Sequence, residues 1–320
     1  MNKLLISLFL CFATISVSAV PENACAVERI VVAGQPFKAV FYLPVSDHPL
    51  PVIITLSGSN GGISESRAKL LASEGFATLA LGYFGIGGLP SNLENIPLEY
   101  FKTAIDWLRA HPAIDRNHIG LYGVSRGAEL SLILGTVYPD SIHAIAAAVP
   151  SSVVYGAMNH PKLPAWTYQG KPIAPSAPFA ASVIETGEDL GQDAEHPLRT
   201  TSQFLEGMKD KKAYERAKIP VEKITCPILL ISGGDDGMWP SSIFAKQIEQ
   251  RLHEKNASIS IQHLHYPNAG HQIGIPGLSS GSLYFHPIAY KWFSMGGTAE
   301  ADEAASQDSW EKLVAFFRQG

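Results

Sequence analysis

The chain has 320 residues, of which 46% are hydrophobic and 17% are charged, and its formal net charge at pH 7 is −5. This composition is that of a globular protein with a sizeable core, and it excludes wholesale disorder. The net negative charge gives no reason to expect a nucleic acid or an anionic membrane surface as a partner.

The first residues, MNKLLISLFLCFATISVSA, have the pattern of a secretory signal peptide. Lys3 supplies the positive end, residues 4–17 the apolar stretch, and Val17-Ser18-Ala19 the small-residue cleavage site. We therefore expect export to the periplasm or the exterior, with cleavage after residue 19 and no stable membrane anchor. A membrane-spanning anchor is the alternative, but the apolar stretch is shorter than the roughly 20 residues that cross a bilayer. A lipoprotein is disfavoured, because Leu10 precedes Cys11 where a small residue is needed.

Two short strands around a Gly-Gln turn are expected in residues 28–44, and strands then alternate with helices. Apolar, β-branched runs that glycine or proline ends predict buried strands, and apolar spacing of three and four predicts helices. The strands are expected within 51–58, 76–83, 118–123, 142–150, 226–234 and 258–267, and the helices within 64–75, 98–111, 128–139, 241–254 and 309–319. This alternation predicts an α/β fold with a mostly parallel sheet and helices on both faces.

Residues 151–222 interrupt the alternation with a proline-bearing, mostly polar stretch. It is too long for a simple connection in a compact domain, so we expect a lid or binding-loop insertion, with a disordered surface loop as the alternative. Its aromatic residues favour the lid, and Trp166 and Tyr168 are expected to line an acyl or leaving-group pocket. The other aromatic residues that favour the lid are Phe179 and Phe204. The expected organisation is a signal peptide over 1–19 and one domain over 20–320.

Gly123-Val-Ser125-Arg-Gly127 fits the pattern G-x-S-x-G, with an apolar strand before it and a helix after it. On such a sharp turn the serine is exposed at the carboxyl edge of the sheet in a strained conformation. The flanking glycines are needed because side chains there would strike neighbouring backbone. Ser125 is therefore the candidate nucleophile, and a glycine-rich packing turn is the alternative.

A serine nucleophile needs a general base and an acid that orients it, and both are expected after later strands. Gly233-Gly-Asp-Asp-Gly follows one predicted strand and Asn268-Ala-Gly-His271 follows the last. His271 is the candidate base. Asp236 is preferred over Asp235 as the acid, because the first aspartate is better placed to cap the turn.

Backbone amides are expected to stabilise the oxyanion. The Arg126 N–H opens the helix after the nucleophile. The second donor should come from the loop Ser57-Gly-Ser-Asn-Gly-Gly62, where the Ser59 amide is preferred and the Asn60 amide is the alternative.

The sequence gives no reason to expect a metal or a cofactor. His263 and His265 share one face of a predicted strand and could bind a metal, but exposed strand histidines explain them better. The loop at 57–62 lacks the lysine of a phosphate-binding loop, and GIGG at 85–88 lacks the dinucleotide fingerprint. In an oxidising compartment Cys25 and Cys226 can pair, and the sequence leaves a disulfide and two free thiols equally open.

From about residue 29 to its end, the chain resembles the α/β-hydrolase domain shared by acyl-CoA thioester hydrolases and bile acid-CoA:amino acid N-acyltransferases. The resemblance rests on RAKLLASEGFATLALGYFG, LEYFKTAIDWLRAHPAI, GVSRGAELSL, WTYQGKPIAP, GGDDGMWPS, YPNAGHQI and SWEKLVAFF, in the family's order. It puts the family's nucleophile on Ser125, its acid on Asp236 and its base on His271. Family members with serine at the nucleophile position tend to be hydrolases, so the resemblance implies hydrolysis and a role in fatty acid metabolism.

The sequence therefore predicts a serine hydrolase that cleaves a small-molecule ester or thioester through an acyl-enzyme. Three alternatives stay open: an exported carboxylesterase on esters other than CoA, an acyltransferase to an amine or alcohol, and a binding module that has lost activity. Two departures from the family bear on them. The β-sandwich domain of its animal members has no room here, and an export signal would separate the enzyme from intracellular acyl-CoA. The oligomeric state is not indicated by the sequence.

Overall fold

The structure is a computed structural model that describes residues 26–160, 162–174, 176–178, 190–277 and 282–319. The expected signal peptide, Cys25 and Phe179 lie outside the described residues. Cleavage after residue 19 therefore stays a prediction, and both alternatives for the buried Cys226, a disulfide to Cys25 or a free thiol, stay open.

Within the described residues, eight strands form a central sheet in the order β1-β2-β4-β3-β6-β7-β10-β11. The first two pairs in this order, β1-β2 and β2-β4, are antiparallel, and the remaining pairs are parallel, as in the registers Ile54↔Leu121 and Ile231↔Leu264. The strands are β1 (Val27–Val31), β2 (Lys38–Pro44), β3 (Leu50–Leu56), β4 (Ala77–Gly82), β6 (Ile114–Val124), β7 (Ala144–Ala148), β10 (Ile228–Gly233) and β11 (Ile261–Tyr266). All eight lie where the sequence predicts strands, which confirms the mostly parallel α/β class.

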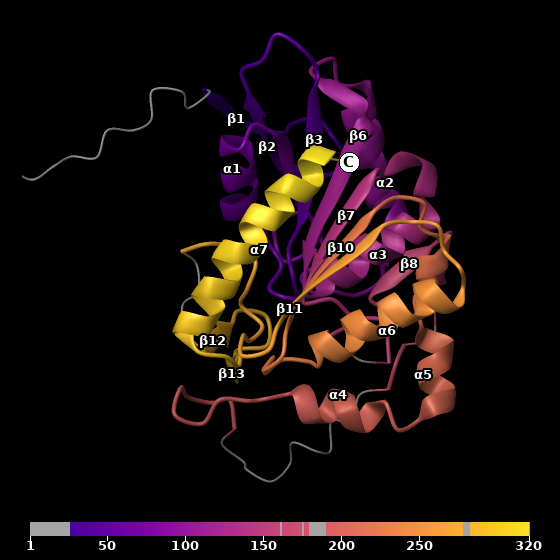
Figure 1. The fold of residues 1–320 in the computed structure, drawn as a ribbon, viewed down its shortest axis with the longest axis vertical. Coiled ribbons are helices and arrows are strands. Elements are labelled where there is room, and N and C mark those ends of the chain that lie inside the picture. Colours follow the sequence, from indigo (N-terminus) through magenta and orange to yellow (C-terminus); the bar gives the residue numbers. More distant parts are fainter. Residues whose placement is uncertain (1–25, 161, 175, 179–189, 278–281, 320) are drawn as a thin grey trace, which may run out of the picture.

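Helices cover both faces of this sheet (Figure 1). One face packs against α2 (Leu98–Ala110), α3 (Arg126–Val137) and α6 (Ser241–Glu254). The other packs against α1 (Glu65–Ser73) and α7 (Ala299–Gln319). Strand residues alternate between the two cores: Leu121 faces the first and Tyr122 the second. The two-sided burial explains why these strands are continuously apolar.

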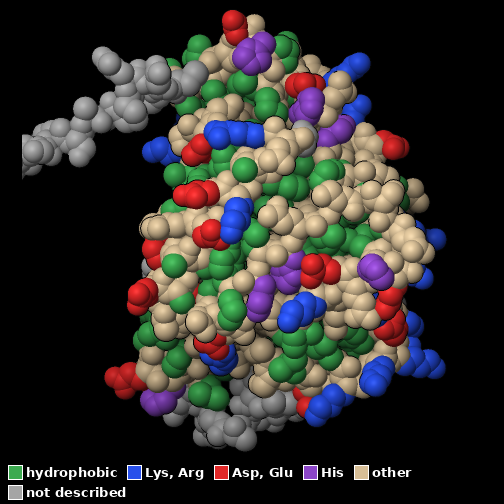
Figure 2. Space-filling model, viewed as in Figure 1, with side chains coloured by type: hydrophobic (Ala, Val, Ile, Leu, Met, Phe, Trp, Pro, Cys, Tyr) green, Lys and Arg blue, Asp and Glu red, His purple; other side chains and the backbone are tan. Residues whose placement is uncertain are grey.

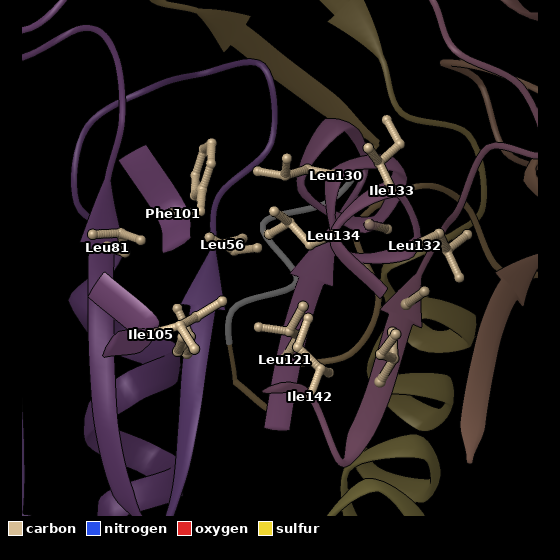
Figure 3. Packing of buried hydrophobic residues seen from close by; sticks show 14 of the residues in the cluster. Leu56, Leu81, Phe101, Ile105, Leu121, Leu130, Leu132, Ile133, Leu134 and Ile142 are labelled. Atoms are coloured by element: carbon tan, nitrogen blue, oxygen red, sulfur yellow. The ribbon is translucent and has the colours of Figure 1, made fainter. Parts of the chain in front are cut away.

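The larger core lies between the sheet and helices α2 and α3. Figure 3 shows Phe101 of α2, Leu56 of β3, and Leu130 and Leu134 of α3 in one layer, with Leu121 of β6 below it. Phe101, Leu121 and Leu134 are each at most 1% exposed. This layer fixes the start of α3 against the ends of the central strands, where the candidate nucleophile lies.

The predicted insertion has secondary structure of its own. It contains β8 (Trp166–Tyr168), β9 (Lys171–Pro172), α4 (Thr201–Gly207) and α5 (Lys211–Ala217), and the short 3-10 helix η3 (Val221–Lys223) follows. β8 and β9 form a small sheet with β5 (Ile96–Pro97), and a second 3-10 helix, η1 (Pro139–Ser141), follows α3. The described parts of the insertion are therefore ordered segments packed on the domain.

A hairpin that the sequence did not predict consists of β12 (Leu283–His286) and β13 (Lys291–Ser294). It pairs with the insertion through a bridge between Leu198 and Phe293, and Leu198, Phe293 and Met295 share an apolar cluster. Figure 1 shows the hairpin and α4 together in the lower part of the view.

The face over α7 carries basic and acidic side chains intermixed with apolar ones (Figure 2). Across the described ranges, no helix is both long enough and apolar enough to span a membrane.

Candidate active site

Ser125 lies in the sharp turn between β6 and α3, with φ 57° and ψ −121°. This left-handed backbone conformation is rare for residues with a side chain and is strained. The turn is held by a hydrogen bond from the Ser125 N–H to Ala148 O (2.9 Å) on the neighbouring strand β7. Ser125 is only partly buried, whereas the residues on either side of it are buried.

The glycines around Ser125 are required by close backbone approach. A Cβ on Gly123 would lie 2.1 Å from Gly127 O, and a Cβ on Gly127 would lie 2.4 Å from both Leu56 O and Ser57 O. These separations are far inside van der Waals contact. The pattern G-x-S-x-G is therefore the sequence that lets β6, α3 and the end of β3 meet at one point.

His271 and Asp236 form a buried pair at the carboxyl end of the sheet. His271 Nδ1 lies 2.9 Å from both carboxylate oxygens of Asp236, and the side chains are 6% and 1% exposed. Asp236 Oδ1 also accepts from the N–H groups of Met238 (2.9 Å) and Trp239 (3.2 Å). A carboxylate held in this way fixes the imidazole with Nδ1 protonated and leaves Nε2 as a proton acceptor.

Asp235 has different partners from its neighbour. It forms an ion pair with Arg199 (2.5 Å) and accepts from the Gly297 N–H (2.9 Å). Burial raises the pKa of its carboxyl, but the Gly297 N–H and the Arg199 charge bring that pKa below its usual range. Of the two aspartates, Asp236 is thus the one in contact with His271.

The loop that carries His271 turns back over β6, which precedes Ser125, and over the neighbouring strand β7. The Tyr122 hydroxyl, three residues before Ser125, donates to Gly274 O (2.8 Å). A Cβ on Gly274 would also contact Ala148 Cβ (3.6 Å) on β7. The base loop therefore lies at the edge of the sheet where Ser125 is. Within the described part of the chain, no hydrogen bond joins Ser125 to His271. Hydrogen bonds between catalytic residues commonly tighten only when substrate binds.

The loop after β3 runs beside the candidate nucleophile. A Cβ on Gly58 would lie 3.2 Å from Ser125 Cβ, so the chain passes Ser125 in direct contact. Ser59 follows, partly buried, and Asn60 is exposed. The Arg126 N–H belongs to the first turn of α3, where N–H groups have no acceptor in the helix. Both candidate oxyanion donors therefore flank the turn that carries Ser125.

The expected role of Trp166 and Tyr168 in lining a pocket is wrong. Trp166 is fully buried, and its indole N–H donates to Glu129 (2.7 Å) under α3. Tyr168 packs on Tyr138 at the other end of α3, with ring centroids 6.0 Å apart. A tryptophan with a buried carboxylate partner is a core residue, and the spacing of WTY in a proline-rich stretch could not show that partner.

Trp239 lies beside His271, and Tyr155 and Phe204 pack on Trp239 in turn. The Trp239 ring is 5.9 Å from the His271 ring and 5.8 Å from Phe204, and Tyr155 packs on Phe204 at 4.9 Å. Phe204 comes from α4, so the insertion reaches the catalytic edge through this residue. Of these, only Phe204 was singled out in the sequence.

His286 was missed by the sequence analysis. It ends β12, is 2% exposed, and its Nε2 lies 2.9 Å from the Ser59 hydroxyl oxygen. The motif HPIAY gives no periodic signal, because the hairpin is short and its position depends on tertiary contacts.

His263 and His265 belong to a second arrangement of serine, histidine and carboxylate. Ser232 Oγ lies 2.8 Å from His263 Nε2, and His263 Nδ1 lies 2.6 Å from Glu249. Ser232 is fully buried inside β10, so no substrate can reach its hydroxyl. No group of three or more metal-ligating side chains occurs among the residues with described positions.

Residues 96–320 match the family described as BAAT / Acyl-CoA thioester hydrolase C terminal. The chain is similar to mitochondrial acyl-coenzyme A thioesterase 2 of Mus musculus, with 32% identity over 92% of this chain and 61% of that protein. It is similarly related to acyl-coenzyme A thioesterase 6 of Homo sapiens, with 31% identity over 92% of this chain and 65% of that protein. It thus spans less than two thirds of these relatives' length.

Among solved structures, a putative dienelactone hydrolase from Klebsiella pneumoniae subsp. pneumoniae MGH 78578 has a TM-score of 0.56 at 17% identity. That match covers 93% of this chain and 100% of the other chain. At this identity the similarity concerns the fold, and it confirms the predicted α/β-hydrolase architecture.

Proposed function

The chain belongs to the BAAT / acyl-CoA thioester hydrolase C-terminal family, and from that premise we propose that it hydrolyses a thioester or ester through an acyl-enzyme on Ser125. The observation that carries this proposal is the His271–Asp236 pair, held at the same edge of the sheet as the strained Ser125. The curated relatives are named acyl-coenzyme A thioesterases, which supports hydrolysis of a thioester.

In the first half of the reaction, Ser125 Oγ attacks the carbonyl carbon of the substrate and its proton passes to His271 Nε2. The new C–O bond forms as the carbonyl π electrons move to the oxygen. When the tetrahedral intermediate collapses, the bond to the leaving sulfur or oxygen breaks and His271 gives that atom its proton. Asp236 keeps Nδ1 protonated and stabilises the imidazolium that forms.

In the second half, water attacks the acyl-enzyme. His271 takes a proton from the water and returns it to Ser125 Oγ as the acid leaves. The N–H groups of Arg126 and Ser59 hold the oxyanion in both halves, and loss of one such donor typically costs about 3 kcal/mol of barrier.

The insertion over residues 151–222 is proposed to act as a lid at this site. Phe204 of α4 supports this role, because it contacts Tyr155 and the Trp239 ring that packs on His271. An apolar wall beside the base is suited to an acyl chain.

An exported carboxylesterase is the second candidate function. The signal-like N-terminal sequence supports it, because export would separate the enzyme from intracellular acyl-CoA. The same residues would act, with an oxygen leaving group in place of sulfur.

The test is turnover of acyl-CoA esters and p-nitrophenyl esters, combined with labelling by a fluorophosphonate. Ser125→Ala is expected to lose turnover and labelling together. Ser232→Ala is the matched control, since it removes the serine of the buried Ser232–His263–Glu249 arrangement and should leave turnover and labelling intact. Turnover by Ser125→Ala at the wild-type rate would overturn the proposal.

A further inference from the structure

The hydrogen bond between Ser59 and His286 joins the oxyanion loop to the β12–β13 hairpin. The two residues are far apart in the sequence, and their side chains meet at 2.9 Å. Neither side chain has a part in the reaction proposed above, which uses only the Ser59 N–H. The inference below rests on that proposed function and deepens it.

The proton on His286 can be assigned from its partners. Its Nδ1 accepts from the backbone N–H groups of Ile288 (3.2 Å) and Ala289 (3.1 Å), so Nδ1 carries no hydrogen. Burial lowers the pKa of this imidazole to about 4, so the ring is neutral near pH 7. The single ring hydrogen is therefore on Nε2, and Nε2–H donates to Ser59 Oγ.

This arrangement determines what the Ser59 hydroxyl can do. Its oxygen is occupied as an acceptor by His286, so its own hydrogen is free to be donated. In the described part of the chain, no other hydrogen bond to Ser59 Oγ occurs. Ser59 is only partly buried and follows Gly58, which lies against Ser125. The free hydrogen is thus available on the loop that borders the nucleophile.

The imidazole is held rigidly. The His286 ring packs on Phe293 of β13 at 5.7 Å and on Tyr284 at 5.8 Å. Just after β13, Met295 O accepts from the N–H groups of His271 (2.8 Å) and Gly237 (2.9 Å). One hairpin therefore contacts the base, the turn of the acid and the oxyanion loop, so its geometry is tied to all three.

We propose that the Ser59 hydroxyl is a side-chain oxyanion donor and that His286 is the positioning residue that aims it. Ser59 then supplies two donors to the acyl oxygen, its N–H and its O–H. Such a hydroxyl strengthens its hydrogen bond as negative charge develops, so its effect belongs to the transition state.

The test is a double-mutant cycle with Ser59→Ala, His286→Leu and both together, measured on an acyl-CoA and a p-nitrophenyl ester. Ser59→Ala keeps the amide and is expected to lower kcat about 100-fold with KM changed less than about twofold. His286→Leu should lower kcat about 10-fold alone and not at all in the Ser59→Ala background, because it acts only through that hydroxyl. His286→Gln keeps an N–H donor and should stay within about threefold of wild type.

Ser46→Ala and His48→Gln form the matched control, since Ser46 Oγ and His48 Nδ1 are also bonded (3.2 Å) on the exposed turn before β3. These substitutions should leave kcat and KM unchanged. Wild-type kcat in Ser59→Ala, or additive effects in the cycle, would overturn the proposal. If the enzyme hydrolyses only oxygen esters, the proposed thioesterase function is wrong, but the double-mutant cycle measured on the p-nitrophenyl ester still tests the roles of Ser59 and His286. The rate at which a fluorophosphonate labels Ser125 depends on the same oxyanion donors and can be measured without substrate. An unchanged labelling rate in Ser59→Ala would also overturn the proposal.

Discussion

Asp235 and Asp236 are adjacent carboxylates with opposite surroundings, and this difference makes the assignment of the acid testable. Asp236 is 3% exposed and contacts His271. Asp235 has a half-exposed side chain, paired with Arg199. A surface ion pair of this kind contributes little to stability, whereas the buried contact to His271 determines the tautomer of the base.

Asp236→Asn is expected to lower kcat by about 10³- to 10⁴-fold, because an amide favours the wrong imidazole tautomer. Asp235→Asn, the control at the neighbouring position, should stay within about threefold of wild type, as expected for a partly exposed pair. Steady-state kinetics with a thermal unfolding curve for each variant checks both. A loss of activity confined to Asp235→Asn would reverse the assignment.

Glu129 is fully buried one turn into α3, and burial raises the pKa of its carboxyl to about 7 against the opposing effects of Arg126 and Trp166. In the unfolded chain the pKa is near 4.5. Between these values the folded state binds more protons than the unfolded state, so stability falls as pH rises. The stabilising effect of the protonated form is fully present below about pH 4.5 and is lost as the pH rises through about 7.

We predict that wild type loses about 3 kcal/mol of unfolding free energy between pH 4.5 and 8 relative to Glu129→Gln. The glutamine keeps an oxygen for the Trp166 N–H but cannot ionise. Urea unfolding of both proteins across this range measures the difference. Parallel pH profiles of the two would mean that Glu129 titrates normally.

At the level of single residues, the sequence could indicate Ser125 and His271 because the ends of parallel strands meet at one edge of the sheet. Ser125 follows β6 and His271 follows β11, so their order along the chain and their place in space are linked. His286 has no such link. It lies on a separate antiparallel hairpin, and its contact with Ser59 depends on how that hairpin packs.

The turn between β6 and α3 is the element most sensitive to added volume. Gly127→Ala would put a Cβ 2.4 Å from Leu56 O and Ser57 O, and backbone atoms cannot move aside as a flexible side chain does. Overpacking of this kind typically costs about 1–3 kcal/mol or more. It would also displace the oxyanion loop that follows Leu56.

Gly127→Ala is therefore expected to lower the free energy of unfolding by about 3 kcal/mol and to reduce kcat, and a gain of stability would contradict it. Gly87→Ala is the matched control, because nothing lies within 4 Å of the added Cβ and φ is not positive. Chemical denaturation of the two variants beside wild type decides the comparison.

The elements that could be predicted are those whose apolar pattern is set by the sheet. Helix α7 could be predicted only in part, because the apolar pattern is present only in its second half. The sequence predicts it from residue 309, but it begins at Ala299, because its first half, AEADEAASQD, has no apolar periodicity. That half buries Asp302 and Ser306, and Asp302 accepts from the Gly270 N–H (2.6 Å) beside His271. Helices α4 and α5 were missed for a similar reason, since each is short and mostly polar.

At the scale of the whole molecule, one edge of the sheet gathers segments from most of the chain. The loop after β3, the turn after β6, the loops after β10 and β11, the hairpin and α4 all reach it. The substrate class depends on where this domain works, because acyl-CoA is intracellular. The N-terminal sequence therefore bears directly on the reaction, although it lies outside the described residues.

We predict that the chain produced from its full-length gene in a bacterial host is exported and begins at Val20, as intact-mass measurement of the purified protein would show. Ala19→Trp should block cleavage and leave the longer chain, because the cleavage site requires a small residue at that position. An exported, processed enzyme meets oxygen esters and not the acyl-CoA pool, so export would favour the second candidate function, in which kcat/KM on p-nitrophenyl esters exceeds that on acyl-CoA. An unprocessed chain that prefers acyl-CoA would contradict both expectations, since the same triad would then be working on the substrate that its relatives are named for.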